Sequence, residues 1–575
     1  MKISSGLFVF IEIRIILIFT YDLLDIMIAQ SHFKRLTLCL TFTVFALQIY
    51  AQQKATYWIE FKDKANTQFS VSKPNEYLSL RAINRRKKNY IDITENDLPV
   101  SKVYVDSIQR TGARVLYTSK WFNAVTIEVN DETIISTIKN ISFVTFLQKT
   151  KNASNVKSNR INTKNKTEFF EDSAEISPAN YGQSLTQINQ LNGLYLHNKG
   201  YKGSSVIIAL IDAGYLNANK YKTLSRLFLE NRILSSHDFV KTNNDIYKEH
   251  MHGAVVLSSI AANLEDTLIG TAPDASFILL RGEDSDSEFP VECDNWIAAA
   301  EYADSCGADI ISSSLGYRTF DDSTMNFSYQ NMNGKIIRSS IAAEIASSKG
   351  MIVVASAGND GNKPWHYIGS PADAKEILSV GAINPYTNKT AFSSFGPSAD
   401  GRIKPEVMAL GESVIVEISP GEYSTINGTS LSCPIVAGLV ACLVQAFPFA
   451  SAIAIRQAVL ESSSQYSVPD NLMGYGIPNF EKAYEILKDS SKLFSMNAYA
   501  FPNPFSENVT IVNTFIDEPE ITIECYSIIG QKIFSLIRNG GYIHFSNEIL
   551  SLEKGSYFFR CISKNKAFTI KAIKM

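Results

Sequence analysis

Five short apolar runs between residues 180 and 490 constrain the fold of this chain most. The runs lack the in-out alternation of a strand with one wet face, so they are expected to be buried on both faces. Longer segments of small residues with helical spacing separate them, which predicts an α/β unit with a mostly parallel sheet and helices on both faces. The runs are 206–211, 276–280, 309–312, 351–355 and 377–380.

The residues that follow these runs are the first candidates for a functional site, because open parallel sheets bind ligands beyond the carboxyl ends of their strands. Asp212 ends the first run and is followed by a glycine turn at Gly214. The same residue also suits a structural role, since aspartate commonly caps strand-end turns. Asn359 follows the run 351–355, where its amide is able to donate a hydrogen bond into a cleft or simply form a turn.

A histidine and a serine are expected to lie at the starts of two buried helices. His252 precedes the small apolar residues 254–262, and Ser430 precedes the apolar segment 435–446. A hydroxyl in a first helical turn lies near free N–H groups and the positive end of the helix dipole, which favour a developing oxyanion. Gly428 permits close approach of another chain, and Pro434 is interpreted as a first-turn proline.

Each of these two residues has a less specific interpretation. A lone histidine at a helix start is usually structural. His250 and His252 together are too few ligands for a zinc site, and Ser430 also suits an N-cap. Neither residue alone therefore distinguishes a catalytic role from a structural one; the motifs have to be taken together.

Taken together, the segments 211–214, 252–253, 357–359 and 428–430 with Pro434 resemble the subtilase family. The chain order of aspartate, histidine and serine is also the order found in subtilisin. Further similarity occurs at 270–273, 314–316 and 392–405, so the resemblance spans the central region. The resemblance implies a subtilisin-like fold and a serine endopeptidase with Asp212, His252 and Ser430 as triad and Asn359 in the oxyanion hole.

The resemblance also implies where a peptide substrate would bind. One edge would pair with the substrate main chain and the opposite stretch would line the first side-chain pocket. Neither stretch contains a charged residue, which suggests an uncharged P1 preference. The residues are Ser314, Leu315 and Gly316 on the edge, and Ala355, Ser356, Ala357 and Gly358 at the pocket.

Four positions depart from the family pattern without removing a triad group, namely Ala254, Val255, Leu431 and Cys433. A buried, inert thiol is the favoured interpretation of Cys433, with sensitivity to thiol reagents as the alternative. No cofactor is assigned. The family resemblance leaves structural calcium open, but no residue of this chain is assigned to a metal.

The flanking regions predict export. Residues 1–51 are expected to contain a signal peptide, with Met27 as initiator and cleavage after Ala51; a single membrane anchor is the alternative. Residues 52–148 are expected to form a small α/β propeptide domain and 149–179 a polar linker, before the peptidase domain at 180–490.

Residues 491–575 are expected to form a small β-sandwich. The segments 501–505, 528–532, 555–557 and 571–574 resemble the type IX secretion sorting domain of Bacteroidota. The resemblance implies the type IX machinery as a partner and a secreted or cell-surface location. A generic adhesive or stabilising sandwich is the alternative.

The net charge of −3, from 54 basic and 57 acidic side chains, gives no field that favours nucleic acid. Protein or peptide substrates are therefore the expected partners of a monomer. Two rival functions stay open: an acyl transferase or peptide cyclase on the same fold, and a binding module that has lost activity. Seven scattered cysteines indicate neither a disulfide scaffold nor a zinc site, and pairing of Cys525 with Cys561 stays open.

Overall fold

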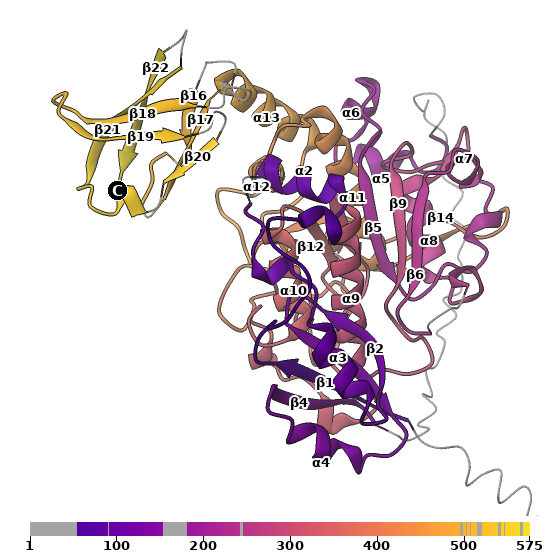
Figure 1. The fold of residues 1–575 in the computed structure, drawn as a ribbon. Coiled ribbons are helices and arrows are strands. Elements are labelled where there is room, and N and C mark those ends of the chain that lie inside the picture. The colour runs from indigo at the N-terminus through magenta and orange to yellow at the C-terminus, as the bar shows by residue number, and fades with distance from the viewer. Residues whose placement is uncertain are drawn as a thin grey trace, which may run out of the picture.

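The computed structural model of the chain shows three parts in sequence order (Figure 1). It describes residues 54–89, 91–152, 181–241, 245–494, 498–501, 503–506, 508–513, 520–538, 542–545, 547–563 and 567–575. The predicted signal region and most of the predicted linker lie outside the described residues.

The central part contains a seven-stranded parallel sheet with strand order β13-β12-β11-β10-β5-β9-β6. All five predicted runs form strands of this sheet. The two unpredicted strands, β6 and β13, lie at its edges. The strands are β5 (Ile207–Asp212), β6 (Ile233–Asp238), β9 (Ser276–Arg281), β10 (Ile310–Ser313), β11 (Ile352–Ser356), β12 (Leu378–Ile383) and β13 (Val407–Leu410).

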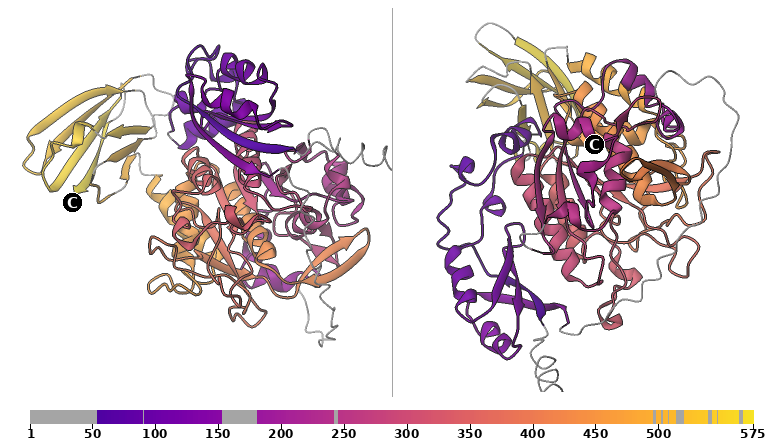
Figure 2. Two further views of the ribbon diagram at one scale, coloured as in Figure 1. Left: turned by 90° about the horizontal axis from the view of Figure 1, so that it is seen from below. Right: turned by 90° about the vertical axis from the view of Figure 1, so that its right-hand side faces the viewer.

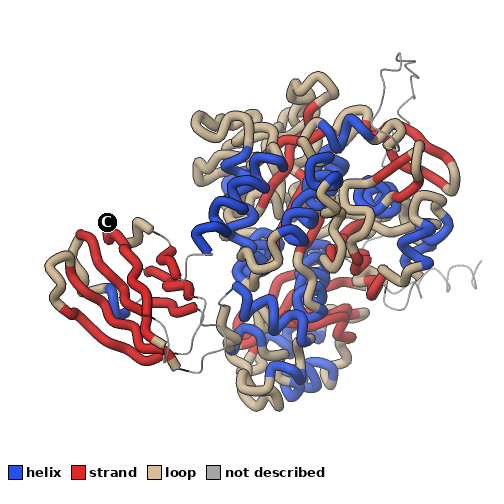
Figure 3. The backbone as a smooth tube through the Cα atoms, turned by 90° about the horizontal axis from the view of Figure 1, so that it is seen from above, coloured by secondary structure: helices blue, strands red, loops and turns tan. Residues whose placement is uncertain are grey.

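Helices cover both faces of the sheet, as the apolar runs predict (Figure 3). Neighbouring residues of β5 face two different cores: Ile208 and Leu210 pack in one, and Ile207, Ala209 and Ile211 in the other. The first core includes α8 (His252–Ala261), α11 (Thr429–Ala446), α12 (Ala452–Ser462) and α13 (Phe480–Phe494). The second includes α9 (Val291–Cys306) and α10 (Arg338–Ser348).

Short elements complete the central part. They are α5 (Leu185–Asn189), α6 (Leu194–Asn198), α7 (Ser225–Leu229), the hairpin of β7 (Asn263–Leu264) and β8 (Leu268–Ile269), and the hairpin of β14 (Val414–Ser419) and β15 (Glu422–Ile426). Among the described helices, only α11 is long and apolar enough to cross a membrane, and most of it is buried in the first core.

The N-terminal part is a small α/β unit with a four-stranded antiparallel sheet of order β2-β3-β1-β4. Figure 2 shows this unit lying along one side of the central part. Its elements are β1 (Ala55–Phe61), α2 (Leu80–Asn89), α3 (Lys102–Gln109), β2 (Arg114–Ser119), β3 (Ala124–Val129), α4 (Ile134–Lys139) and β4 (Val144–Lys151). Residues 149–151, predicted as the start of the linker, instead extend β4 because they pair with β1.

The C-terminal part consists of two antiparallel sheets, β16-β17-β20 and β19-β18-β21-β22, that enclose an apolar core. This agrees with the predicted sandwich. Cys525 and Cys561 are buried in that core as free thiols. The strands are β16 (Ala498–Phe501), β17 (Val509–Asn513), β18 (Ile521–Ser527), β19 (Lys532–Arg538), β20 (Tyr542–Phe545), β21 (Gly555–Ile562) and β22 (Ala567–Lys574).

Candidate active site

Asp212 and His252 form a hydrogen-bonded pair at the carboxyl edge of the sheet. Asp212 is the last residue of β5 and is fully buried, and His252 is the first residue of α8. The imidazole Nδ1 lies 2.7 Å from Asp212 Oδ1, which also accepts the backbone N–H of Ala213 at 2.7 Å. An ionised carboxylate only accepts, so Nδ1 carries the proton and Nε2 is left as the base in the neutral ring.

Two glycines allow the end of β5 and the start of α8 to come this close. A Cβ on Gly253 would lie 2.5 Å from the carbonyl oxygen of Gly214 and 2.9 Å from the Cβ of Asp212. A Cβ on Gly214 would lie 2.5 Å from the amide nitrogen of His250, and its φ of +150° is rare for other residues. Gly214, two residues after Asp212, and Gly253, directly after His252, therefore have a steric role in holding the Asp212–His252 pair.

The charges around His252 favour its imidazolium form. Burial lowers the pKa of His252, but the charge and hydrogen bond of Asp212, together with the charge of Glu283, outweigh burial and raise the pKa to about 9. The ion pair of protonated His252 with Asp212 therefore stabilises the folded protein. This stabilisation is complete below the unfolded-state pKa of about 6.5 and is lost as the pH rises through about 9. A general base must be neutral to accept a proton, so activity is expected to rise with pH over the range in which this stabilisation falls.

We expect activity to increase with pH up to about 9, since His252 accepts a proton only when neutral. Glu283→Gln removes one charge that raises the pKa of His252, so the acid limb of the kcat/KM profile should move to lower pH. Glu265→Gln is the matched control, because this exposed residue follows the far end of α8. Equal profiles for the wild type and Glu283→Gln would contradict this electrostatic role.

Arg281 is a buried residue that the sequence analysis did not identify. It ends β9, next to β5, and its Nε donates to the Ala213 carbonyl at 2.9 Å. Its two terminal nitrogens form ion pairs with Asp238 at 3.1 Å and with Glu249 at 3.3 Å. The guanidinium thus connects the turn after Asp212 to the segment that leads into His252, which makes Arg281 a positioning residue.

Arg281→Met should lower the free energy of unfolding by about 3–5 kcal/mol, since it leaves the buried carboxylate of Asp238 without its cation. It should also lower kcat more than it raises KM, because the Asp212–His252 geometry loses its support. Urea unfolding and steady-state kinetics measure the two effects. The double variant Arg281→Met with Asp238→Asn should recover part of the stability without recovering kcat; recovery of both would show a purely structural residue.

Ser430 lies in the first turn of α11, one residue after the helix begins. Gly428 caps this end and α11 packs against α8, which carries His252. A Cβ on Gly428 would lie 2.9 Å from Ser430 Oγ and 3.7 Å from Asn359 Nδ2. The serine hydroxyl and the asparagine amide nitrogen therefore face the same space beside Gly428.

The interpretation of Pro434 as a first-turn proline is wrong. The helix begins at Thr429, so Pro434 lies in the second turn, where its missing N–H leaves the carbonyl of Ser430 without an intrahelical donor. The Ser314 hydroxyl donates to that carbonyl at 2.8 Å. The side chain of Ser314 thus supports the helix that carries Ser430.

Asn359 is oriented by Thr429, another residue that the sequence analysis passed over. The backbone N–H and the hydroxyl of Thr429 each lie 3.0 Å from Asn359 Oδ1. A backbone N–H can only donate, so the amide oxygen must face Thr429 and the NH₂ group must face the Gly428 side. The Gly358 N–H in turn donates to the Thr429 hydroxyl at 3.1 Å.

The residues predicted to bind substrate lie at and just beyond the ends of two neighbouring strands, at the same edge of the sheet. Ser314, Leu315 and Gly316 directly follow β10, whereas Ala355 and Ser356 end β11 and Ala357 and Gly358 follow it. The two stretches therefore lie beside each other at the end of the sheet where Asp212 lies. Their contact with substrate stays a prediction.

Cys433 is fully buried and contacts the carbonyl oxygens of Ser313 and Val354 at 3.5 and 3.4 Å. Burial raises the pKa of this thiol to about 12, so we expect it to be inert. The part of the chain that the structure describes contains no group of three or more His, Cys, Asp or Glu side chains placed to hold a metal ion, and we assign none.

A carboxylate, an imidazole and a serine hydroxyl around one edge of a parallel sheet define a class of site, that of the serine hydrolases. Comparison with known proteins specifies the family. Residues 203–476 match the model of the Subtilase family. The chain is 30% identical to Subtilisin NAT of Bacillus subtilis subsp. natto over 308 residues, which cover 53% of this chain and 72% of that protein.

A subtilisin of Bacillus pumilus is 29% identical over 300 residues, or 52% of this chain and 97% of that protein. The chain belongs to the subtilase family and is a serine peptidase. Residues 56–168 match the Peptidase S8 propeptide domain of Bacteroidota, and residues 499–575 match a secretion system C-terminal sorting domain. These matches agree with the resemblances drawn from the sequence.

Proposed function

We propose that the chain is a secreted endopeptidase that cleaves peptide bonds through an acyl-enzyme on Ser430. His252 Nε2 takes the proton of Ser430 Oγ as that oxygen attacks the scissile carbonyl carbon. Asp212 holds the ring and stabilises the imidazolium. The imidazolium then protonates the leaving amine, the C–N bond breaks, and a water attacks the acyl-enzyme by the same two proton transfers.

The observation that carries this proposal is the Asp212–His252 pair, with 2.7 Å between Nδ1 and Oδ1, beside the helix that carries Ser430 in its first turn. The oriented amide of Asn359 supports it, because a donor aimed beside the serine hydroxyl suits the oxyanion that forms during attack. The Ser430 N–H is a second donor, since first-turn amides have no partner within their helix.

Substrate would bind in extended form between the two predicted stretches. Residues 314–316 would hydrogen-bond its main chain as an added strand, and residues 355–358 would line the pocket for its P1 side chain. Leu315, Ala355 and Ala357 are buried in the second core, so their positions are fixed by the packing of the sheet. An uncharged P1 residue is the expected preference.

The flanking parts indicate how the enzyme is exported and controlled. The C-terminal match to a secretion sorting domain supports export to the cell surface or medium by the type IX machinery, after passage of the inner membrane on the signal peptide of residues 1–51. The N-terminal match to a propeptide domain supports synthesis as a zymogen that is processed within residues 149–173.

Fluorophosphonate labelling and casein hydrolysis test the proposal. The processed wild type should label and cleave casein, whereas Ser430→Ala should do neither. Ser430→Ala should also accumulate as an uncleaved precursor if processing is autocatalytic. A wild type that behaves like Ser430→Ala after removal of the N-terminal part would refute the peptidase mechanism.

A further inference from the structure

The face of the N-terminal sheet packs on α9, where the Ser119 hydroxyl and the backbone N–H groups of Lys120 and Trp121 donate to the buried carboxylate of Glu301. Beyond this face, the N-terminal unit contacts the catalytic unit at two further places. At the end of β4, the Lys151 ammonium lies 3.3 Å from Asp284 Oδ2 and 2.8 Å from Ser287 Oγ, and the next residue, Asn152, contacts Asp322. These contacts lie beyond the carboxyl end of β9. The second place is formed by α2, which lies well away from β1, β4 and α4 of its own unit (Figure 1).

One face of α2 presents Arg81, Arg85 and Asn89, which are spaced four residues apart and so lie in one row on the helix. Arg81 donates to the carbonyl oxygens of Gly307 at 3.1 Å and Ser205 at 2.7 Å, and it also pairs with Asp309. These acceptors directly precede β5 and β10. Arg81 therefore binds at the amino end of the sheet, opposite the catalytic edge.

Arg85 is buried and is bound mainly by backbone carbonyls of the catalytic unit. Its Nε donates to the Lys349 carbonyl at 3.2 Å, and its terminal nitrogens donate to the carbonyls of Ala308 and Asp304 and to the Asp304 carboxylate. The Asn89 side chain accepts the backbone N–H of Ala452 at 2.8 Å. The row on α2 thus contacts the segments before β10, β11 and α12.

A buried charge cluster reinforces this contact. The Asp304 carboxylate forms ion pairs with Arg86 at 2.9 Å and with Lys120 at 2.8 Å, in addition to its pair with Arg85. Nearby, Lys349 forms an ion pair with Asp97 at 3.1 Å. Burial would raise the pKa of Asp304, but the charges of Lys120, Arg85 and Arg86 hold it well below its ordinary value. Both units contribute cations and anions, so each leaves buried charges unpaired if the other departs.

Two glycines of the catalytic unit allow α2 to pack closely against it. Gly307 ends α9 and Gly350 follows α10, with φ of +89° and +83°. A Cβ on Gly307 would lie 2.7 Å from the Cβ of Arg81, and a Cβ on Gly350 would lie 2.7 Å from the Asn89 side chain. The carbonyls that accept the arginines lie at the negative ends of these two helices, where cations are favoured.

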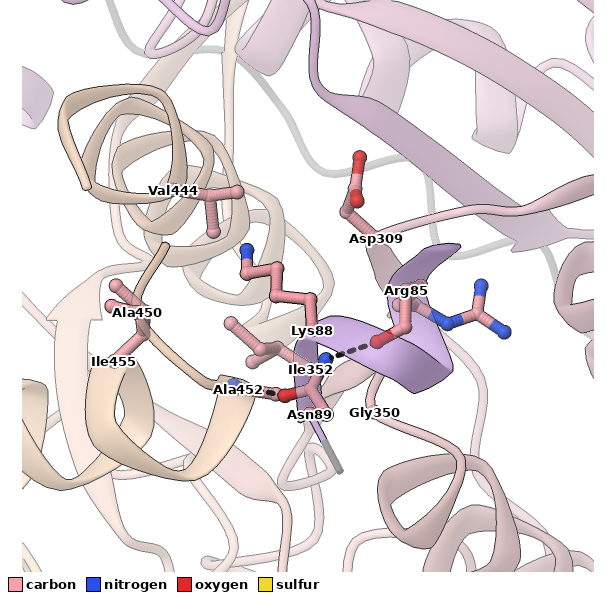
Figure 4. Close-up of a pocket in the computed structure, with 10 residues that line it drawn as sticks. All are labelled: Arg85, Lys88, Asn89, Asp309, Gly350, Ile352, Val444, Ala450, Ala452 and Ile455. Atoms are coloured by element: carbon pink, nitrogen blue, oxygen red, sulfur yellow. Dashed lines mark hydrogen bonds between the residues drawn. The ribbon is translucent and has the colours of Figure 1, made fainter. Parts of the chain in front are cut away.

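A pocket lies directly between α2 and the catalytic unit (Figure 4). Lys88 extends from α2 into it toward Val444, while Ile352 and Ile455 of the catalytic unit line it with the Asn89 side chain. The contact between α2 and the catalytic unit therefore includes charged, polar and apolar side chains.

We propose that the amino edge of the parallel sheet is a second binding site, separate from the catalytic cleft, for a helix that carries two arginines one turn apart. Its occupant is α2, and this contact, added to that of the sheet face on α9, keeps the N-terminal unit bound to the catalytic unit after the linker is cut, so that loss of the α2 contact speeds its release. This deepens the proposed function, since it concerns how the same enzyme is held in its zymogen form.

The full chain tests this proposal with Ser430→Ala in place and a recognition sequence for an added site-specific protease within residues 153–180. After the cut, the chain is immobilised by its C-terminus and the release of the N-terminal fragment is timed. The wild-type contact should retain the fragment. Arg85→Gln should release the fragment about a hundredfold faster, because the buried acceptors lose their cation. Arg81→Ala should release it about tenfold faster, because the Arg81 side chain is 40% exposed and its ion pair contributes less.

Lys102→Ala is the matched control, since among the described residues this exposed lysine of the same unit pairs with Asp106 of its own helix alone. Lys151→Ala with Asn152→Ala reports on the contact beyond β9 and should change the release by less than tenfold. A fragment that leaves the wild type as fast as Arg85→Gln, or that depends on Lys151 and Asn152 instead, would overturn the proposal. Ser430→Ala has no acyl-enzyme chemistry, so the outcome does not depend on the proposed mechanism.

A synthetic peptide of residues 74–97 covers the case in which an Arg85 variant fails to fold. Added in excess to the cut chain with the wild-type contact, the peptide should increase the fraction of free N-terminal fragment at equilibrium. The same peptide with Arg81→Gln and Arg85→Gln should not. Equal effects of the two peptides, or no effect of either, would count against an arginine-specific site.

Discussion

Ser430→Ala is expected to lower kcat by about a millionfold, the magnitude seen in subtilisin when the nucleophile is removed. The reason is chemical: without Oγ no acyl-enzyme forms, and His252 has no hydroxyl to deprotonate. The residual rate should come from substrate binding and the oxyanion donors. Steady-state hydrolysis of a peptide substrate by the processed enzyme measures the loss; active-site titration gives the concentration of working sites in the wild type, and protein concentration gives it for Ser430→Ala.

Ser432→Ala is the matched control for this prediction. Ser432 lies two residues further along α11, is fully buried, and its hydroxyl has no hydrogen-bond partner among the described residues. Removing an unpaired buried hydroxyl should leave activity and stability close to wild type. A loss of activity at Ser432 equal to that at Ser430 would mean that the helix start, and not the Ser430 hydroxyl, is what the reaction needs.

The buried sheet could be predicted because its strands are encoded locally. Runs such as 206–211 and 351–355 are apolar without alternation, which is the pattern of strands covered on both faces. Once these runs are taken as parallel strands, the residues after them must meet at one edge. The sequence therefore predicts Asp212 and Asn359 on the same side of the sheet, as the structure shows.

The supporting residues could not be predicted in the same way, because their roles depend on contacts between distant segments. Arg281 gave one available signal, a charged residue at the end of a buried run, but its partners Asp238 and Glu249 come from two other segments. The contact of α2 with the amino edge of the sheet joins Arg85 to Asp304 across the domain boundary. Local periodicity carries no information on such pairings.

The error on Pro434 has the same origin. A proline near a helix start is expected in the first turn, where the backbone amides have no acceptor within the helix. Here the missing N–H falls in the second turn, and the free carbonyl of Ser430 is satisfied by Ser314 from the end of a neighbouring strand. The compensation depends on tertiary structure, so the position of the proline alone gave the wrong boundary.

Asn359→Ala is expected to lower kcat by about a hundredfold to a thousandfold with little change in KM, the loss found for the corresponding kind of donor in subtilisin. The amide NH₂ is aimed beside Ser430 by the bonds from Thr429 to Asn359 Oδ1. An oxyanion exists only during the reaction, so a donor that stabilises it affects kcat and not substrate binding.

Variants of Thr429 test whether Asn359 acts through its oriented amide or only through packing. Thr429→Val keeps the shape of the side chain but removes the hydroxyl that bonds Asn359 Oδ1 and accepts the Gly358 N–H, so it should lower kcat by about tenfold. Thr429→Ser retains the hydroxyl and should stay close to wild type. If Asn359→Ala raised KM and left kcat intact, the amide would bind the ground state of the substrate, and the Ser430 N–H would have to stabilise the oxyanion without it.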